Sequence, residues 1–361
     1  MKKSSLLTIK NRLFTIVAVG AIAATSVLSG CAAASEEVND NQVLTQAENG
    51  SGENTESEQD NIGADDVNAE EEAVFPITIT DALDREVTIE SADRVVTLLG
   101  SFADMWYLAG GEVVASVNDT WTNYELGLDD SVVNLGSMLS PDLELLVAAE
   151  PDLVIASAGN NAQIELADTL TSTGITVVYF EVSDFNDYLA MLDTLTDITG
   201  RKDLYQTYGT DVEAMVSEQK ARAEAAASQE GFEAPTVLFI RAAASSVKAK
   251  GSTGTVGGEI LADIGTVNIA DSDGVLLEEL SLEVIVAADP DYIFVTTQGE
   301  DTEAALANVE ELLKSNTAWS SLSAVQNGNY YEIDKALYNS KPNARWGEAY
   351  KILVDILYPE F

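Results

Sequence analysis

Five basic side chains stand out in a chain that is otherwise poor in cations. Of the 361 residues, 61 are acidic and 18 are lysine or arginine, which gives a net charge of -43. Four of the 18 cations lie in the first 12 residues, which leaves 14 for the remainder. The five are Arg241, Lys248 and Lys250 in one group and Lys341 and Arg345 in another. Because arginine and lysine bind anions through charge-assisted hydrogen bonds, these groups predict a pocket for an anionic ligand.

Each of these cations also has an ordinary explanation. Arg345 can pair with Glu348 in the next helical turn, and the lysines can serve only to relieve repulsion among the many acidic residues. The prediction of an anion pocket therefore rests on the grouping rather than on any single member. A cationic ligand would be inconsistent with the same grouping.

The rest of the composition excludes several kinds of chemistry. The chain has no histidine and one cysteine, which removes the usual zinc or manganese ligands, a Ser-His-Asp triad, a structural disulfide and a proximal histidine for haem. No metal site is expected. The strongly acidic balance argues against nucleic acid and anionic lipid surfaces as partners. An extracellular hydrolase that uses Asp119, Glu181 or Glu259 stays open, although no spacing brings two of these carboxylates together.

Uncharged candidates for ligand contact lie where apolar runs of the first half end. Ser101 and Phe102 follow the run 95–99, and ligands of α/β sheets bind beyond the carboxyl ends of strands. The alternative is that Ser101 caps the next helix and Phe102 packs in the core. Asn118 and Trp121 belong to a polar loop that suits an organic ligand with rings, unless that loop is only a surface feature held by one buried tryptophan.

A repeated stretch indicates the scaffold that positions these residues. Residues 139–155 and 280–295 share one order of features: a short amphipathic helix, a proline and a buried strand. The two copies are offset by 139 residues, so that Glu144 in the first corresponds to Glu283 in the second. Proline ends a helix, and an apolar β-branched run then continues as a strand. The repeat predicts two α/β lobes built to one plan with a cleft between them.

The remaining elements follow from periodicity. Alternating residues over 77–89 predict a hairpin, and helices are expected over 184–199 and 203–227. Asn327-Gly328 is expected to turn a second hairpin into the strand that starts at Tyr330. Apolar runs predict a parallel sheet in the first lobe and the opening strand of a second sheet, at 95–99, 112–117, 153–156, 177–180 and 236–240.

Several segments together resemble ABC transporter substrate-binding proteins of the iron-siderophore and cobalamin class. They are the repeated pair, the run 94–104 and the closing run 341–350. The resemblance implies the class III solute-binding fold, in which two α/β lobes are joined by a single long helix and the ligand binds between them. It places the lobes at 76–200 and 230–361. The connecting helix is then 201–229, for which an exposed helix of one lobe is the alternative.

The resemblance also implies a function. Such a protein captures a ligand outside the cytoplasm, without covalent chemistry, and delivers it to a permease and its ATPase. Glu144 and Glu283 match the glutamates that meet the permease, although helix-dipole complementation is the alternative. Tyr338, Lys341 and Trp346 match the positions of ligand contacts in the second lobe. The ligand expected is an anionic ferric siderophore chelate bound by a monomer, while haem with Tyr338 on its iron, cobalamin, and a sensory role without transport stay open.

The amino terminus predicts export and anchoring. Basic residues precede an apolar stretch at 13–27, which is the layout of a signal peptide over residues 1–30. Leu28-Ser29-Gly30-Cys31 resembles a bacterial lipobox, which implies cleavage before Cys31 and attachment of lipid to its sulfur. An uncleaved membrane anchor is the alternative. Residues 31–75 are acidic and polar, which predicts a disordered tether between the cell membrane and the lobes.

Overall fold

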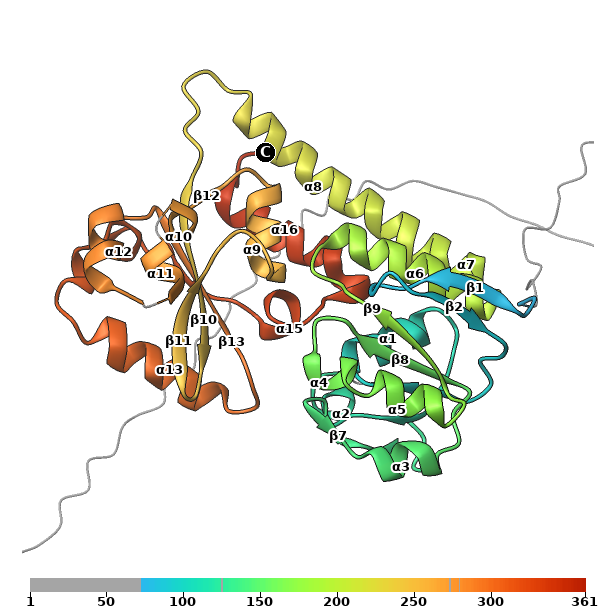
Figure 1. The fold of residues 1–361 in the computed structure, drawn as a ribbon. Helices are drawn as coiled ribbons and strands as arrows, with labels where there is room; N and C mark the ends of the chain where they lie inside the picture. The colour runs from blue at the N-terminus through green and yellow to red at the C-terminus, as the bar shows by residue number, and fades with distance from the viewer. Residues whose placement is uncertain (1–72, 125, 273, 279) are drawn as a thin grey trace, which may run out of the picture. The chain divides into compact units, whose positions relative to one another are not determined.

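The computed structural model describes residues 73–124, 126–272, 274–278 and 280–361 (Figure 1). These residues belong to one unit of the chain, which spans Asp65–Phe361. The predicted signal peptide, Cys31 and the tether up to residue 72 lie outside the described residues. Among the residues that are described, none of the helices has the length and apolar character needed to cross a membrane.

The first lobe is built on a five-stranded parallel sheet with the order β5-β4-β3-β8-β9. Its central strands are apolar because both faces are covered by helices. The predicted hairpin is confirmed as an antiparallel pair, and so is the predicted parallel sheet. The strands are β1 (Ile77–Thr80), β2 (Glu86–Ile89), β3 (Val95–Thr97), β4 (Val113–Ser116), β5 (Val133–Asn134), β8 (Leu153–Ser157) and β9 (Thr176–Phe180), with a small hairpin of β6 (Gly136–Ser137) and β7 (Ser140–Pro141).

Six helices complete the first lobe, and two of them correct the sequence-based expectation. Helix α1 starts at Gly100, directly after extended Leu99, so Ser101 is not its cap. Only glycine fits at residue 100, because a Cβ there would lie 2.7 Å from the backbone of Asp119. The polar stretch 118–124 forms a short helix rather than a loop. The helices are α1 (Gly100–Leu108), α2 (Asp119–Asn123), α3 (Leu143–Ala148), α4 (Asn161–Ile164), α5 (Ala167–Ser172) and α6 (Phe185–Thr199).

The second lobe is built on a sheet with the order β11-β10-β13-β14, with β12 beside β10. β10 (Thr236–Ala243) pairs antiparallel with β11 (Ser246–Lys250) and parallel with β13 (Tyr292–Thr297). The strand expected to follow a hairpin turn at Asn327 instead follows a helix and pairs in parallel with β13, so that prediction was wrong. The other elements are β12 (Val267–Asn268), β14 (Tyr330–Glu332), α9 (Val256–Asp263), α10 (Ile269–Ser272), α11 (Gly274–Glu278), α12 (Leu282–Ala288), α13 (Thr302–Val309), α14 (Ser323–Gln326) and α15 (Lys335–Tyr338).

A long helical run connects the two sheets in the chain and packs against the last helix. It consists of α7 (Lys202–Tyr205), a π-helical turn (Gln206–Thr210) and α8 (Asp211–Ala227), and Figure 1 shows α8 running along the same side as α16 (Trp346–Leu357). One hydrophobic cluster includes residues of both sheets and of α6, α8 and α16. Within it the rings of Phe185 and Trp346 lie 5.7 Å apart at 62°. The two lobes therefore share a core.

Both copies of the repeated segment make the same turn before their proline. Glu150 and Asp289, the residues that precede the two prolines, have φ angles of 48° and 43°. Non-glycine residues seldom adopt this left-handed conformation. The turn redirects the chain from α3 into β8 in the first lobe and from α12 into β13 in the second.

The aspartate after each proline ties two neighbouring strands together. Asp291 accepts hydrogen bonds from the backbone N–H and the hydroxyl of Thr236, the first residue of β10. Asp152 does the same for the segment that enters β3, accepting from the Ser91 hydroxyl and the N–H groups of Asp93 and Arg94. In each lobe the repeated segment therefore connects two neighbouring strands through the hydrogen bonds of one aspartate. We call Asp152 and Asp291 with these hydrogen bonds the joints of the two sheets.

Candidate functional site

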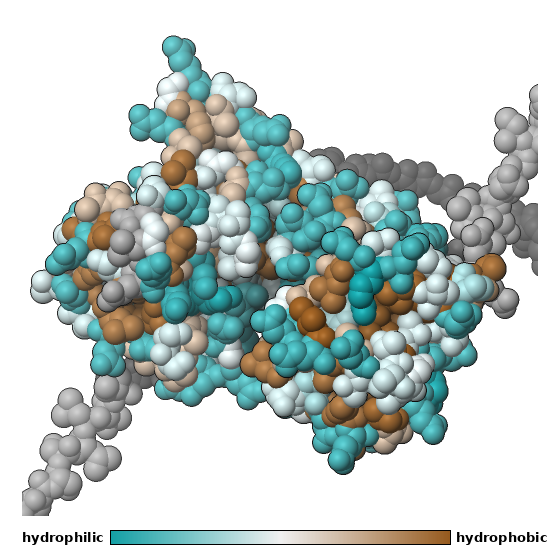
Figure 2. Space-filling model, in the orientation of Figure 1, coloured by the Kyte–Doolittle hydropathy of each residue, from teal (hydrophilic) through white to brown (hydrophobic). Residues whose placement is uncertain are grey.

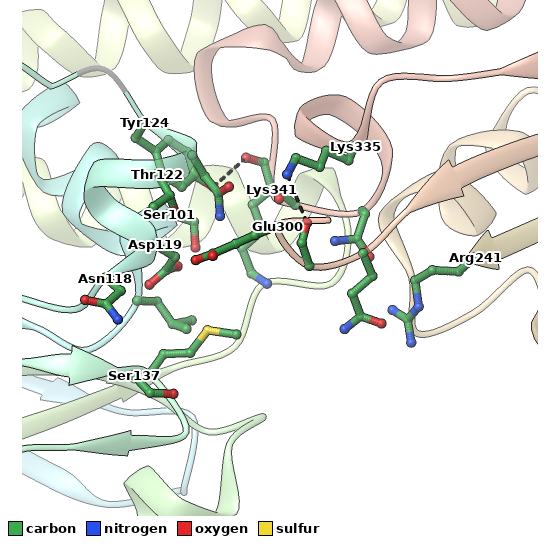
Figure 3. A pocket seen from close by; sticks show the side chains of 17 residues that line it. Ser101, Asn118, Asp119, Thr122, Tyr124, Ser137, Arg241, Glu300, Lys335 and Lys341 are labelled. Carbon is green, nitrogen blue, oxygen red and sulfur yellow. Dashed lines mark hydrogen bonds between the residues drawn. The ribbon is translucent and has the colours of Figure 1, made fainter. Parts of the chain in front are cut away.

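A pocket of about 380 Å³ lies between elements of the two lobes (Figure 3). In the space-filling view, hydrophilic residues predominate where the lobes meet on the face shown (Figure 2). We call this cavity the cleft pocket. It is lined by Leu99, Ser101, Asn118, Asp119, Thr122, Asn123, Tyr124, Ser137, Met138, Arg241, Gln298, Gly299, Glu300, Lys335, Asn339, Ser340 and Lys341.

The first-lobe wall offers hydroxyl, amide and carboxylate oxygens. Ser101 comes from the first turn of α1, and Asn118 and Asp119 come from the start of α2. Asp119 Oδ2 accepts a hydrogen bond of 2.9 Å from the Gly100 N–H, whereas its Oδ1 is buried without a partner. Burial raises the pKa of Asp119, against the lowering effect of the Gly100 N–H. This wall can accept hydrogen bonds from a ligand.

The second-lobe wall carries the cations. Arg241 stands near the carboxyl end of β10, and Lys335 opens α15. The Lys335 ammonium donates to the Gly299 carbonyl at 3.0 Å. The Arg241 guanidinium makes no ion pair or hydrogen bond with any described residue, and burial lowers the pKa of Arg241. Figure 3 shows Arg241 and Lys335 on second-lobe elements, across from Ser101, Asn118 and Asp119.

Lys341 joins the two walls. Its backbone carbonyl accepts a hydrogen bond of 3.3 Å from the Tyr124 hydroxyl of the first lobe. Burial lowers the pKa of Lys341, and the carboxylates of Glu181, Asp119 and Asp187 partly offset that effect. No hydrogen bond joins the Lys341 ammonium to another of the described residues. The ammonium is therefore held near first-lobe carboxylates by charge alone.

The antiparallel pair β10–β11 carries three cations on one face. Arg241 is directly opposite Lys248, and Lys250 lies two residues further along β11. Residues opposite one another on antiparallel strands point to the same side, and like charges in that position repel. Burial lowers the pKa of Lys250, and the charges of Arg241 and Lys248 add to this effect. A bound anion would relieve the repulsion.

The other described cations all have partners. Acidic side chains pair with Arg85, Arg201, Lys202, Lys220, Arg222, Lys314, Arg345 and Lys351. Arg94 and Lys335 donate to backbone carbonyls. Within the described part of the chain, Arg241, Lys248, Lys250 and Lys341 alone have neither an ion pair nor a side-chain hydrogen bond, although acidic residues are abundant.

The model of the periplasmic binding protein family matches residues 95–337. The chain belongs to the periplasmic binding protein family. The predicted class III fold and the resemblance to ABC transporter substrate-binding proteins are thereby confirmed.

Known relatives agree with this assignment. A cobalamin-binding protein of Halobacterium salinarum is 26% identical, covering 80% of this chain and 77% of the relative. An ABC transporter substrate-binding lipoprotein of Bacillus subtilis, YvrC, is also 26% identical, with coverage of 80% and 87%. The Fe(3+)-citrate-binding protein YfmC of the same organism is 25% identical, with coverage of 67% and 73%. The structure of a periplasmic haem-binding protein from Pseudomonas aeruginosa superposes with a TM-score of 0.61 at 21% identity, covering 74% of this chain and 94% of that one.

Four residues predicted as ligand contacts of this binding protein line the cleft pocket: Ser101, Asn118, Arg241 and Lys341. Lys248 and Lys250 lie outside the pocket, on the same hairpin face as Arg241. Trp121 also lies outside it, although its neighbour Thr122 is part of the wall. The structure thus brings together members of both predicted cation groups.

Three predicted contacts are corrected, because their side chains belong to the core of the binding protein. Phe102 and Trp346 are completely buried, and Tyr338 is 1% exposed. The Tyr338 hydroxyl donates to the Ala349 carbonyl at 3.0 Å, so it does not point into the cleft pocket or toward a haem iron there. Arg345 is bound to Glu348 and lines a different cavity. The pairing with Glu348 is the alternative that the sequence had left open.

Sequence reasoning missed a second group of lining residues. Gln298, Gly299 and Glu300 follow the carboxyl end of β13, and Lys335 opens α15. The rule that ligands bind beyond strand ends had been applied to the first lobe only. Applied to the run 292–297, it would have found the first three. Among the described residues, no cluster of three or more side chains could hold a metal ion.

Glu144 and Glu283 occupy matching places in the binding protein. Each is exposed in the first turn of its helix, α3 or α12. The cap of α3 is the stronger, because Asp142 accepts two backbone hydrogen bonds of 3.0 Å. Ser281 accepts one of 3.4 Å. Both glutamates are free to meet a partner.

Proposed function

We propose that this protein captures an anionic ferric chelate outside the cytoplasm and hands it to an ABC permease driven by its ATPase. One observation carries the proposal: Arg241, Lys248, Lys250 and Lys341 stay unpaired in the described part of a chain with 61 acidic residues. Three of them, Arg241, Lys248 and Lys250, lie beside one another on β10 and β11, and their mutual repulsion is unfavourable unless a ligand supplies the counter-charge. The family assignment supports solute binding, and a relative named for ferric citrate supports this class of ligand.

Binding requires no covalent step. The first-lobe wall accepts hydrogen bonds from hydroxyl or amide groups of the chelate, and the second-lobe cations neutralise its carboxylate, catecholate or hydroxamate oxygens. We propose that Glu144 and Glu283 meet basic residues of the permease, that the protein acts as a monomer, and that lipid on Cys31 anchors it to the cell membrane.

Tryptophan-fluorescence titration of residues 73–361 tests the ligand class. The ligands are ferric citrate, ferric hydroxamate and catecholate siderophores, haem and cyanocobalamin. We expect saturable binding of a ferric chelate, and Arg241→Ala should weaken it by about 10-fold to 100-fold, the usual cost of one charge-assisted contact. Lys351→Ala is the matched control, since it also removes a cation but one paired with Asp355. Equal affinity in both variants would remove Arg241 from the site.

A second candidate ligand is cobalamin, favoured by the relative from Halobacterium salinarum. Tight binding of cyanocobalamin with no effect of Arg241→Ala would replace the ferric chelate in the proposal. Binding of cyanocobalamin alone would leave the fold and the transport role intact.

A further inference from the structure

A second cavity adjoins the cleft pocket. It has a volume of about 530 Å³, and we call it the side pocket. Asn123, Tyr124 and Lys341 line both cavities, so these three residues form the wall between them. The cleft pocket alone is near the lower end of the roughly 300–1,000 Å³ typical of ligand sites, whereas the two cavities together approach the upper end.

The central residue of the wall is Tyr124, whose hydroxyl interacts with the Ser101 side chain and with Lys341. The Tyr124 hydroxyl donates to the Lys341 carbonyl at 3.3 Å, which is beyond the usual range of such bonds. Tyr124 immediately follows the last residue of α2, and its backbone is extended. Burial raises the pKa of Tyr124, so its hydroxyl stays protonated as a donor. A rotation of this one side chain would break the bond and open the wall.

Asn343, next in the chain to the lining residues Pro342 and Ala344, makes shorter hydrogen bonds to the first lobe. Asn343 is completely buried, and its amide donates to the Ser101 carbonyl at 2.9 Å and to Asp104 Oδ2 at 2.7 Å. These two bonds also join the lobes. They would keep the lobes joined if the long bond between Tyr124 and Lys341 were broken.

The side pocket differs chemically from the cleft pocket. Leu108, Leu126, Ala336 and Pro342 supply aliphatic surface. Its cations have other roles: Arg345 is bound to Glu348, and Lys341 lies near first-lobe carboxylates. Among the lining residues that the structure describes, the one carboxyl group is that of Asp104, which is bound by Asn343 and whose pKa is raised by burial. The space therefore suits an uncharged group.

We propose that the side pocket is a second ligand compartment, which accepts an apolar acyl or aromatic arm of the chelate. Tyr124 is the specificity residue that separates it from the cleft pocket. With the tyrosine in place the protein favours compact chelates, and its displacement admits ligands with an arm. This inference rests on the proposed capture of an anionic chelate in the cleft pocket.

Two ferric chelates with one citrate-hydroxamate core test it: schizokinen, with acetyl groups, and acinetoferrin, with longer acyl chains. Tyr124→Ala should raise the affinity for ferric acinetoferrin by at least about tenfold, since even one well-placed methylene is worth about 10-fold or more. Because Tyr124 also lines the cleft pocket, the deciding quantity is the ratio of the affinities for the two chelates, which should shift toward ferric acinetoferrin by at least about tenfold. Tyr124→Phe removes only the hydroxyl and should shift the preference in the same direction by less.

Two further variants separate the compartment from a general loosening of the site. Thr122→Ala widens the cleft pocket without touching the side pocket and should leave the preference unchanged. Ala336→Phe fills the side pocket and should cancel the gain when combined with Tyr124→Ala. Melting curves verify that each variant is folded.

The outcomes are distinct. If both chelates bind but Tyr124→Ala and Tyr124→Phe leave their ratio unchanged, the compartment is refuted while the proposed function stands. The compartment is likewise refuted, while the proposed function stands, if Ala336→Phe fails to cancel the gain in affinity for ferric acinetoferrin that Tyr124→Ala produces. If neither chelate binds the unaltered protein or the Tyr124 variants, the ligand class itself is refuted and the compartment with it.

Discussion

The two lobes share a structural joint but present different chemistry to the cleft. In each lobe a short helix, a left-handed residue, a proline and an aspartate lead into a central strand. The pocket walls, however, differ: Asp119 faces the cleft from the first lobe, and Arg241 faces it from the second. None of the wall residues named here belongs to the repeated helix and strand. The repeat thus maintains the architecture, while the segments outside it determine what is bound.

The largest expected effect concerns Glu144 and Glu283, which lie in the first turns of the two repeated helices. Substituting Glu144→Ala and Glu283→Ala together should lower uptake of the ferric chelate by at least about tenfold, because both proposed charged contacts with the permease would be lost. Binding of the chelate should be unchanged. Uptake by whole cells and fluorescence titration measure the two quantities.

Glu303→Ala is the matched control, since Glu303 is also exposed in the first turn of a helix. Unequal effects of the two single variants would show that the copies have diverged in docking. Full uptake by the double variant would exclude these glutamates from it.

The joints themselves should differ in strength. Asp152→Ala removes three hydrogen bonds and should lower the free energy of unfolding by about 2–3 kcal/mol, whereas Asp291→Ala removes two from a more exposed site and should cost about 1–2 kcal/mol. Urea denaturation measures both. Asp130→Ala is the control, since Asp130 is exposed and lies outside the strands, and it should change the free energy of unfolding little. The reverse order would show that the second joint is the critical one.

Removing the N-caps of α3 and α12 should lower the free energy of unfolding by smaller amounts, which differ less from each other. Asp142→Ala removes two N-cap hydrogen bonds of α3 and should cost about 1–2 kcal/mol, while Ser281→Ala removes one long bond of α12 and should cost about 0.5–1 kcal/mol. Thermal melts followed by circular dichroism give the comparison. Asp142→Asn retains a hydrogen-bond acceptor and should recover most of the lost stability. If it does not, the charge of Asp142 rather than its hydrogen bonds stabilises α3.

The smallest effect is a pH dependence present in one copy only. Hydrogen bonds from the Ser323 hydroxyl and N–H lower the pKa of Asp289 below its ordinary value. A carboxylate whose pKa is lower in the folded state than in the unfolded state stabilises the fold at pH values above its unfolded pKa. This stabilisation is lost as the pH falls through the folded pKa. Asp289→Asn should therefore cost a few tenths of a kcal/mol at pH 7, and this cost should disappear as the pH falls through the folded pKa of Asp289. Glu150→Gln, at the equivalent position, is the control, because no described residue donates a hydrogen bond to the Glu150 side chain.

Local rules predicted most of the architecture, apart from the hairpin at Asn327. Periodicity and prolines placed the repeated segments and the first-lobe sheet, the rule of strand ends placed Ser101 at the cleft, and the grouping of cations placed Arg241 there. The same rules could not reveal the bonds of Asp152 and Asp291, because their partners lie 55 to 61 residues away in the chain. Such pairings depend on which strands become neighbours.

Side-chain direction was the main limit at the site. Phe102 was expected at the ligand because it follows the end of a strand, and Trp346 because it matches the position of a ligand contact in the resembling family, yet both point into the shared core. A shift of one residue along a helix turns a side chain by about 100°, so adjacency to a site does not imply contact with it. Ser101, the neighbour of Phe102, does line the pocket.

The last helix has a consequence for the order of folding. Trp346 and Leu353 of α16 belong to the same buried cluster as Phe102 of the first lobe, and α16 packs along α8. This shared cluster therefore remains incomplete until α16 has been synthesised. The other buried clusters, one in each lobe, do not include α16, so the part of the core that waits for this helix is the part that joins the lobes.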